Sequence, residues 1–345
     1  MNKIYNLLDE KFVSALFIKE VLPKYPNFSD IKQIKISAIK KHIWETTYHV
    51  VLEFKTIFLT NDKKNKIVSI YCTAHSDEPR LNSFEALTFL WQNGFNQGNL
   101  TIPRPLFYSK DFNAFFYEGV VGENLYQYIR RKDINAVEHI VIKSAMWFAK
   151  LHCLSAIAAK AKNFNPLNSL IETVIPGMVH VLTKVQSFYP RYFGVCRQTY
   201  EIINQKEKDF FSSTKQRWLI HGDAHPENVI SINKNKIGVI DFTDICIADF
   251  TRDLGTFLQQ LEFMMLRKID SQLEIKKIKQ LFLNNYFKNA KITLDDNIQK
   301  RIDNYYNWAI LRSAIFFLLK DKTEPERAHG LLIKISQNLK LNITI

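Results

Sequence analysis

A polar loop between short apolar segments is the feature that most constrains this chain. Residues 218–220 and 229–232 are strand-like, and the loop between them reads His-Gly-Asp-Ala-His-Pro-Glu-Asn, from His221 to Asn228. A third strand-like segment, 237–240, delivers Asp241 at its end. Alternating or continuous apolar runs bounded by turn residues predict strands and a hairpin. We therefore expect rigid backbone to hold the loop and the carboxylate of Asp241 side by side.

Three side chains of this region offer the oxygen atoms that phosphoryl transfer requires. Asp223 could take the proton from an acceptor hydroxyl. Asn228 and Asp241 could hold Mg²⁺ against the phosphates of a nucleotide, because hard cations prefer oxygen ligands. Taken singly, Asp223 could cap a helix and Asn228 could brace a loop. Their spacing relative to Asp241 favours the catalytic interpretation.

This pattern resembles the aminoglycoside phosphotransferase and choline kinase group of small-molecule kinases, which are related to protein kinases. The motif is HGDxHxxN, then IDFxD, then Asp249-x-x-x-Asp253-Leu. The similarity spans about residues 31 to 260 and is most specific at 218–255. Other segments that match in the expected order are Leu81–Leu87, Ile102–Leu106, Ala114–Glu118, Gly122–Leu125 and Ala149–His152.

The resemblance implies an α+β, two-lobed, protein-kinase-like fold. A small N-terminal antiparallel sheet lobe would occupy residues 1–118, with an extra helix at 1–23, and a larger helical lobe would occupy 119–345. Strand-like segments first and helices after agree with segregated layers. The resemblance also implies that the nucleotide base bonds the backbone around Glu118 to Val120. Asp253 would anchor the catalytic loop through backbone bonds.

The third strand departs from the family pattern. In the family it supplies a lysine that contacts the α- and β-phosphates and pairs with a helix glutamate, here Glu85; this chain has Ser69 at the lysine position. A buried glutamate without a cation is costly or becomes protonated. Three alternatives remain open. Lys55, Lys40 or Lys41 fills the space, or a bulge lets Lys66 do so, or the protein is a weak kinase or pseudokinase.

The phosphate-covering loop is also unusual. Residues 36–48 should form the first strand, the loop and the start of the second strand, and they contain no glycine. Backbone N–H groups then approach phosphates less closely than in a glycine-rich loop. Side-chain donors could compensate, or the segment is an ordinary hairpin with a solvated basic tip. The candidates for such donors are Lys40, Lys41, Thr46 and Thr47.

A zinc hydrolase is the competing interpretation of the two loop histidines, His221 and His225. No third His or Cys stands nearby with ligand spacing, and zinc would leave the Ile-Asp-Phe strand unexplained. We therefore expect both histidines to hydrogen-bond the loop backbone. Asp249 is expected to cap the helix that follows it.

Bulk properties agree with a cytoplasmic enzyme. The net charge of +13 comes mainly from lysine, without a basic patch interleaved with aromatic residues, so we expect no nucleic-acid partner. No run approaches the length of a membrane span, so we expect no membrane partner. The four cysteines lie far apart and indicate reduced thiols. The N-terminus lacks the apolar run of a signal peptide.

We therefore predict an ATP- or GTP-dependent phosphotransferase that uses Mg²⁺ to phosphorylate a hydroxyl of a small molecule. The resemblance implies aminoglycoside-, choline- or sugar-like acceptors, recognised by acidic residues such as Asp244 and Glu262. Tyr305, Tyr306 and Trp308 would pack in the core or line the acceptor pocket. A catalytically silent binding or scaffold protein is the alternative. The sequence leaves the acceptor, the nucleotide and the oligomeric state open.

The expected secondary structure follows from the same periodicities. A helix is expected at 3–22, and strands at 31–40, 46–59, 66–73, 105–109 and 113–118. Further helices are expected at 81–93, 136–155, 168–188, 196–212, 252–267, 272–289, 295–320 and 325–340.

Overall fold

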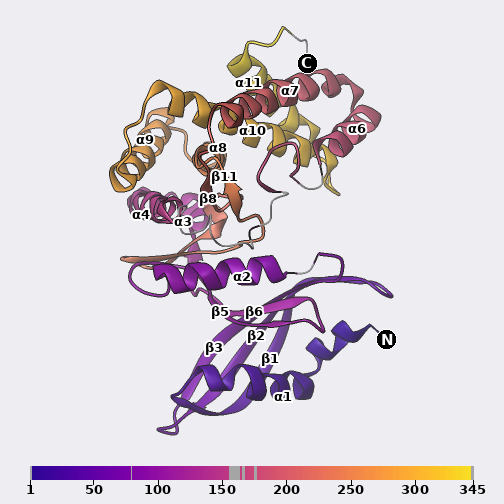
Figure 1. The fold of residues 1–345 in the computed structure, drawn as a ribbon, viewed down its shortest axis with the longest axis vertical. Helices are drawn as coiled ribbons and strands as arrows, with labels where there is room; N and C mark the ends of the chain where they lie inside the picture. Colours follow the sequence, from indigo (N-terminus) through magenta and orange to yellow (C-terminus); the bar gives the residue numbers. More distant parts are fainter. Residues whose placement is uncertain (1, 79, 155–163, 165–167, 175–176, 343–345) are drawn as a thin grey trace. The chain divides into compact units, whose positions relative to one another are not determined.

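The computed structural model describes residues 2–342 except 79, 155–163, 165–167 and 175–176. It comprises two compact units, coloured along the chain in Figure 1. Unit 1 contains residues 1–122 and 235–243, and unit 2 contains residues 123–234 and 244–345. An antiparallel sheet dominates unit 1 and helices dominate unit 2, which is the α+β organisation expected.

The sheet of unit 1 has five strands in the order β1-β2-β3-β6-β5. Its strands are β1 (Phe28–Ile43), β2 (Tyr48–Thr60), β3 (Asn65–His75), β5 (Arg104–Ser109) and β6 (Ala114–Glu118). Unit 1 also contains η1 (Lys3–Leu8), α1 (Glu10–Glu20), η2 (Leu22–Lys24), α2 (Leu81–Leu90), the π-turn η3 (Trp91–Phe95), β4 (Leu100–Thr101) and β10 (Lys236–Val239). β4 and β10 pair in parallel.

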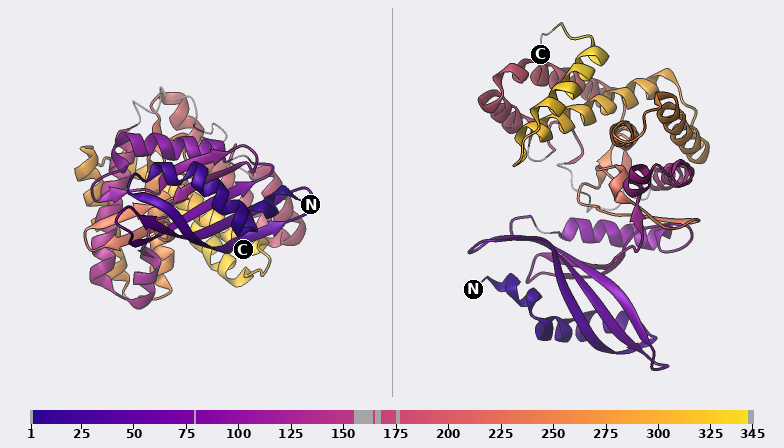
Figure 2. Two further views of the ribbon diagram at one scale, coloured as in Figure 1. Left: turned by 90° about the horizontal axis from the view of Figure 1, so that it is seen from below. Right: turned by 180° about the vertical axis from the view of Figure 1, so that it is seen from behind.

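The extra N-terminal helix covers one face of this sheet. The expected helix at 3–22 is a 3₁₀ turn followed by α1, because the Asp9 side chain accepts from the Phe12 N–H and caps a new helix start. Phe17 of α1 packs edge-on against Phe54 and Phe116 of the sheet. In Figures 1 and 2, α2 lies on the opposite side of the sheet from α1. Each face of the sheet therefore has its own helix.

Unit 2 is built around packed helices and short strand pairs. β8 (Trp218–Ile220) pairs with β11 (Cys246–Ala248), and β7 (Glu123–Asn124) pairs with β9 (Val229–Asn233). The remaining elements are α3 (Leu125–Arg131), α4 (Ile134–Cys153), α6 (Met178–Phe188), α7 (Pro190–Ser213), η5 (Pro226–Asn228), α8 (Thr251–Leu266), α9 (Gln272–Ala290), α10 (Asp296–Leu319) and α11 (Pro325–Leu339).

Helices α8 and α10 approach unusually closely at Gly255. A Cβ placed on Gly255 would lie 2.6 Å from both the Ile302 carbonyl oxygen and the Tyr306 amide nitrogen. Because real Cβ atoms do not come so near to backbone, only glycine permits this crossing. The two helices are therefore locked at this point of unit 2.

Most expected elements are confirmed, with shifted ends. The largest difference concerns the helix expected at 168–188, because α6 begins only at Met178. Asn168 instead has a 3₁₀ rather than an α-helical conformation, and its carbonyl oxygen accepts hydrogen bonds from Arg252 and from the Cys246 thiol. These tertiary bonds compete with a helical ladder. Residues 175–176 of that expected helix, and residue 155 of the helix expected at 136–155, lie outside the described residues.

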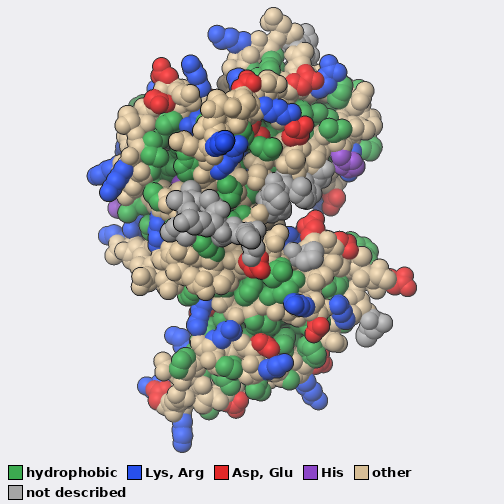
Figure 3. All heavy atoms as spheres, in the orientation of Figure 1, with side chains coloured by type: hydrophobic (Ala, Val, Ile, Leu, Met, Phe, Trp, Pro, Cys, Tyr) green, Lys and Arg blue, Asp and Glu red, His purple; other side chains and the backbone are tan. Residues whose placement is uncertain are grey.

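Lys and Arg side chains are interspersed with Asp and Glu on the face drawn in Figure 3. The four cysteines are free thiols. Within the described part of the chain, no helix combines the length and apolar character that crossing a bilayer requires.

Candidate active site

The loop His221–Asn228 connects two strands that belong to different pairs, β8 with β11 and β9 with β7. Pro226 begins the 3₁₀ turn η5, where a missing backbone N–H costs nothing. The Asn228 side-chain amide donates to the Asp223 carbonyl oxygen at 3.0 Å. That bond closes the loop on itself and brings two of the predicted site residues, Asp223 and Asn228, together.

Asp253 fixes the first part of this loop from the N-terminal turn of α8. Its carboxylate accepts from the backbone N–H groups of His221 at 2.7 Å and Gly222 at 2.9 Å. It also lies 3.1 Å from Nε2 of His152. The Asp253 side chain is only 1% exposed. Burial opposes its ionisation, but the His152 side chain and the loop donors outweigh burial and lower the pKa of Asp253. The expected anchoring of the loop by Asp253 is confirmed.

The two loop histidines act on the backbone, as predicted. Nδ1 of His221 accepts from the Asp223 N–H, and Nδ1 of His225 accepts from the Glu227 N–H. Among the residues described, no group of three or more His, Cys, Asp and Glu side chains is arranged to hold a metal ion. This geometry gives the zinc interpretation no support.

The backbone at position 222 requires glycine. Its φ is +86°, and a Cβ there would lie 2.1 Å from the Asp244 carbonyl oxygen. Any side chain would therefore meet both backbone strain and a hard collision. The fixed conformation of Gly222 sets the direction of the backbone at the next residue, Asp223.

The carboxylate of Asp223 is kept ionised by its neighbours. Its side chain is 33% exposed and its Oδ2 lies 3.5 Å from Nε2 of His225. Burial works against the charge, but the hydrogen bond and charge of His225, with the charge of Arg312, hold the pKa of Asp223 well below its usual range. An ionised carboxylate can accept a hydrogen bond from a neutral hydroxyl but cannot donate one.

A cavity of about 500 Å³ in unit 2 adjoins Asp223. Asp223 and Glu227 supply its carboxylates, while Arg267, Arg312 and Arg327 supply cationic groups. Its walls come from the loop, α3, α8, α10 and α11. The other lining residues are Tyr126, His225, Thr256, Gln260, Phe263, Met264, Ala309, Ser313, Phe316 and Phe317.

Asp241 belongs to unit 1 and follows β10. Its φ of +64° is uncommon for a residue with a side chain, although Asp tolerates it better than most. Its Oδ1 accepts from the N–H of Thr243 at 3.3 Å and the hydroxyl of Thr243 at 2.8 Å. Strained backbone of this kind gathers at functional sites.

The register of β2 and β3 bears on the missing lysine. Ser69 lies directly opposite Lys55, and the pairing runs without a bulge from His49↔His75 to Leu59↔Asn65. The side chains of directly opposed residues project from the same face of a sheet, so the Lys55 side chain lies on the face that carries Ser69. Lys66 is three positions from Ser69 in an unbroken strand and leaves the other face. The register therefore favours Lys55 over Lys66.

The remaining nucleotide-side candidates are scattered over unit 1. Glu85 lies half-buried in α2, and no ion pair joins it to a described lysine. Lys40 and Lys41 lie on β1, opposite Val51 and Val50 respectively, so their side chains leave opposite faces. The Glu118 side chain accepts from the Tyr25 hydroxyl at 2.6 Å and lies near Arg104. Between Glu118 and Val120, the Gly119 N–H donates to the Ser69 carbonyl oxygen.

The acidic residues expected to recognise a cationic acceptor have other partners. Glu262 forms ion pairs with Lys279 and Lys334. Asp244 accepts from the Asn168 side chain at 3.3 Å. Tyr305 is buried in the core and donates to Glu207, whereas Trp308 both packs in the core and lines a second cavity. Asp249 bonds the N–H of Thr251 at the start of α8, as expected.

Sequence reasoning missed the arginine-lined wall beside Asp223. The sequence offered one signal: Arg312 is the only charge in the mainly apolar stretch 308–319, and a charge in such a stretch is rarely buried without a partner. Arg267 and Arg327 lie in no distinctive sequence pattern.

Comparison with known proteins identifies the family and the fold. Residues 49–276 match the phosphotransferase enzyme family. The fold is similar to spectinomycin phosphotransferase solved with ADP and spectinomycin (11% identity, 96% and 98% of the two chains covered, TM-score 0.58). It is also similar to an amicoumacin kinase solved with AMP-PNP, Ca²⁺ and its antibiotic (14%, 94% and 94%, 0.58) and to a choline/ethanolamine kinase family protein from Mesorhizobium loti (12%, 96% and 95%, 0.54). A search of curated proteins found no match. Since the family match covers well over half of the sequence, the chain belongs to the phosphotransferase enzyme family and has its kinase-like fold.

Proposed function

We propose that the protein transfers the γ-phosphoryl group of ATP or GTP to a hydroxyl of a small molecule, with Asp223 as the base. The observation that carries this proposal is the anchored loop: Asp253 fixes its backbone, and Asn228 binds the carbonyl oxygen of Asp223. Such a loop presents an ionised carboxylate on rigid backbone, beside a cavity of the second unit. Preorganisation of this kind supplies most of the catalysis in phosphoryl transfer.

In the reaction, the acceptor oxygen forms a bond to the γ-phosphorus while the bond from that phosphorus to the β–γ bridging oxygen breaks. The acceptor proton passes to Asp223 and then to solvent, and the nucleoside diphosphate leaves. Because Asp223 is a weak base, its main contribution is to orient the hydroxyl before attack and to accept the proton late. The low pKa of Asp223 keeps it ready for this task at neutral pH.

Asn228 and Asp241 are the residues that we propose to hold Mg²⁺. Their donors fit the ion, since each offers an oxygen atom and the Asn228 amide nitrogen is already committed to the loop. When bound, Mg²⁺ would neutralise charge on the transferring phosphates. Lys55 would contact those phosphates in place of the missing third-strand lysine, with Lys40 nearer the strand tip on the same face of the sheet. Backbone groups around Glu118 and Val120 would bind the base.

The test is the Asp223→Asn variant, assayed for Mg²⁺-dependent transfer from radiolabelled ATP and GTP to a panel of alcohols. We expect kcat to fall about 10³-fold, because removal of a general base costs about 10²–10⁴-fold, with nucleotide affinity unchanged. Asp270→Asn, the same substitution at an exposed carboxylate that lines neither cavity, is the matched control and should retain turnover. Equal turnover in Asp223→Asn would refute its assignment. No Mg²⁺-dependent nucleotide binding by the parent protein would instead favour a silent scaffold.

A further inference from the structure

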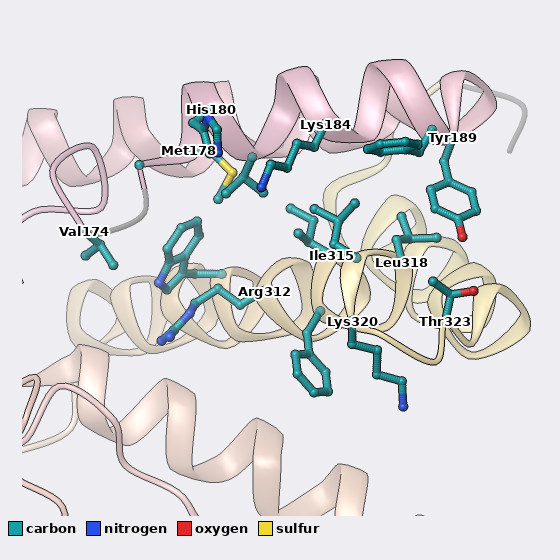
Figure 4. Close-up of a pocket in the computed structure, with 16 residues that line it drawn as sticks. Val174, Met178, His180, Lys184, Tyr189, Arg312, Ile315, Leu318, Lys320 and Thr323 are labelled. Carbon is teal, nitrogen blue, oxygen red and sulfur yellow. The ribbon is translucent and has the colours of Figure 1, made fainter. Parts of the chain in front are cut away.

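A second cavity, of about 890 Å³, lies between α6 and α10 in unit 2. Figure 4 shows His180 and Lys184 coming from the upper helix and Ile315 and Leu318 from the lower one, facing each other. Its size and mostly apolar lining are typical of sites for drug-sized molecules. Nothing in the mechanism above uses it.

Several polar groups of this cavity only donate hydrogen bonds, among them the Trp308 indole and the Lys184 ammonium group, whereas the hydroxyls of Tyr189 and Thr323 can also accept. The Trp308 side chain is 2% exposed, and its indole N–H has no hydrogen-bond partner among the described residues. Indole N–H only donates, and leaving such a group unpaired in the interior costs free energy. Lys184 and Arg312 add positive charge, and no Asp or Glu is among the described residues that line the cavity. A ligand here should be apolar and should carry acceptor oxygens.

The α6–α10 cavity shares a wall with the cavity beside Asp223. The side chains of Arg312 and Phe316 line both. In Figure 4 the Arg312 guanidinium points away from α6. Its charge lowers the pKa of Asp223, yet within the described part of the chain its side chain forms no ion pair or hydrogen bond. A half-buried guanidinium placed in this way is suited to an anionic group of a bound molecule.

The charges around Asp223 discriminate against a polycation. Arg267 and Arg312 line the cavity without an ion-pair partner among the described residues, and Arg327 is paired with Glu324. Glu262 was one of the acidic residues expected to recognise a cationic acceptor, but it already forms ion pairs with Lys279 and Lys334. A cationic acceptor would therefore meet like charge and few available carboxylates.

We infer that the acceptor is an apolar alcohol bearing an acidic group. Its hydroxyl would lie at Asp223, its acidic group would pair with Arg312 or Lys184, and its apolar body would fill the α6–α10 cavity. This inference rests on the proposed phosphotransfer, but it adds a substrate class and a binding site to it.

Two matched amphiphiles test the inference: ω-hydroxydodecanoic acid and ω-aminododecanol, which have the same apolar chain and hydroxyl but opposite charge. Kanamycin is the polycation without an apolar body. Calorimetry with the full chain, without nucleotide, should show that the acid binds at least about tenfold more tightly than the amine, a difference of about one charge-assisted hydrogen bond. Transfer from Mg²⁺–ATP should follow the same order.

Two variants locate the site. Lys184→Glu should weaken binding of the acid about tenfold or more, whereas Lys206→Glu, an equally exposed lysine on α7, should not change it. Phe316→Glu places a carboxylate on the shared wall and should have a similar effect. Leu273→Glu on α9 is its control, since both side chains are largely exposed and tolerate replacement.

The outcomes separate the inference from the proposed function. Transfer to kanamycin or ω-aminododecanol in preference to the acid overturns the inference and leaves the phosphotransferase intact. Failure of the acid to bind, or binding that both variants leave unchanged, overturns it as well. Binding of the acid at the α6–α10 cavity without any transfer overturns its role as acceptor. In this experiment, absence of Mg²⁺-dependent transfer to every alcohol tested is the outcome that counts against the proposed function.

Discussion

The loop at 221–228 and the turn at 44–47 both have a role in the expected mechanism, the loop in proton transfer and Mg²⁺ binding and the turn in covering the phosphates. They differ in how their backbone is held. Buried bonds to Asp253 hold the loop from within unit 2. The turn between β1 and β2 is closed near the surface. The Trp44 N–H donates to the Thr47 carbonyl oxygen, the Asn2 side chain donates to the carbonyl oxygens of Trp44 and Thr47, and Trp44 is 58% exposed. The loop keeps every residue of the family motif, whereas the turn lacks glycine. The buried anchor therefore restricts which amino acids the loop around Asp223 can carry, whereas the exposed turn can change its sequence more freely.

Removing the anchor of the loop should give the largest effect. Asp253→Ala leaves two backbone N–H groups and His152 without their acceptor in the interior. We expect a loss of about 3–5 kcal/mol in the free energy of unfolding, as for other broken buried charge pairs. Chemical denaturation measures it. A loss below about 1 kcal/mol, the size of an ordinary exposed pair, would show that the loop is not held in this way.

Gly222→Ala tests the shape of the loop rather than its anchor. The new Cβ would collide with the Asp244 carbonyl oxygen, and the residue would keep an unfavourable positive φ, so we expect about 2–3 kcal/mol of destabilisation. Gly194→Ala is the matched control, because a Cβ there meets nothing and α7 should gain up to about 1 kcal/mol. Equal melting temperatures for the two variants would contradict the prediction.

The nucleotide side should respond more weakly. Lys55→Met should raise the KM for nucleotide about tenfold, the equivalent of about 1.4 kcal/mol, while Lys66→Met on the opposite face should not. Steady-state kinetics at fixed Mg²⁺ distinguish them. The reverse order would mean that the strand register does not select the phosphate-binding lysine.

The smallest expected effect concerns acid. The pKa of Asp253 is lowered in the folded state, so its contribution to stability is full above the unfolded value of about 3.9 and is lost as pH falls through the folded pKa. Between about pH 5 and about pH 3, the parent protein should therefore lose more unfolding free energy than Asp253→Asn does. Parallel curves from denaturant titrations would argue against an ionised Asp253.

Local patterns were sufficient for the strands of unit 1 and for long helices such as α10, whose periodicity extends over many turns. The family resemblance, rather than local patterns, predicted Asp253 as the anchor of the loop. Local patterns did not reveal that Ser69 lies opposite Lys55, because strand register depends on pairing across the chain. The absence of an α-helix at Asn168 depends in part on a hydrogen bond from Arg252, which is far away in sequence. The cavity between α6 and α10 likewise arises from packing between distant helices.

The contact at Gly255 has an evolutionary consequence. α8 carries Asp253 at one end, and its backbone touches that of α10 at Gly255, two residues later. A change in acceptor specificity therefore cannot come from a shift of α10 along α8, because such a shift would displace Asp253, which anchors the loop at 221–228. New acceptors would instead be accommodated by exchanging side chains farther along α10, beyond Trp308, and on α6. Descendants of this protein should diversify there while the crossing itself stays unchanged.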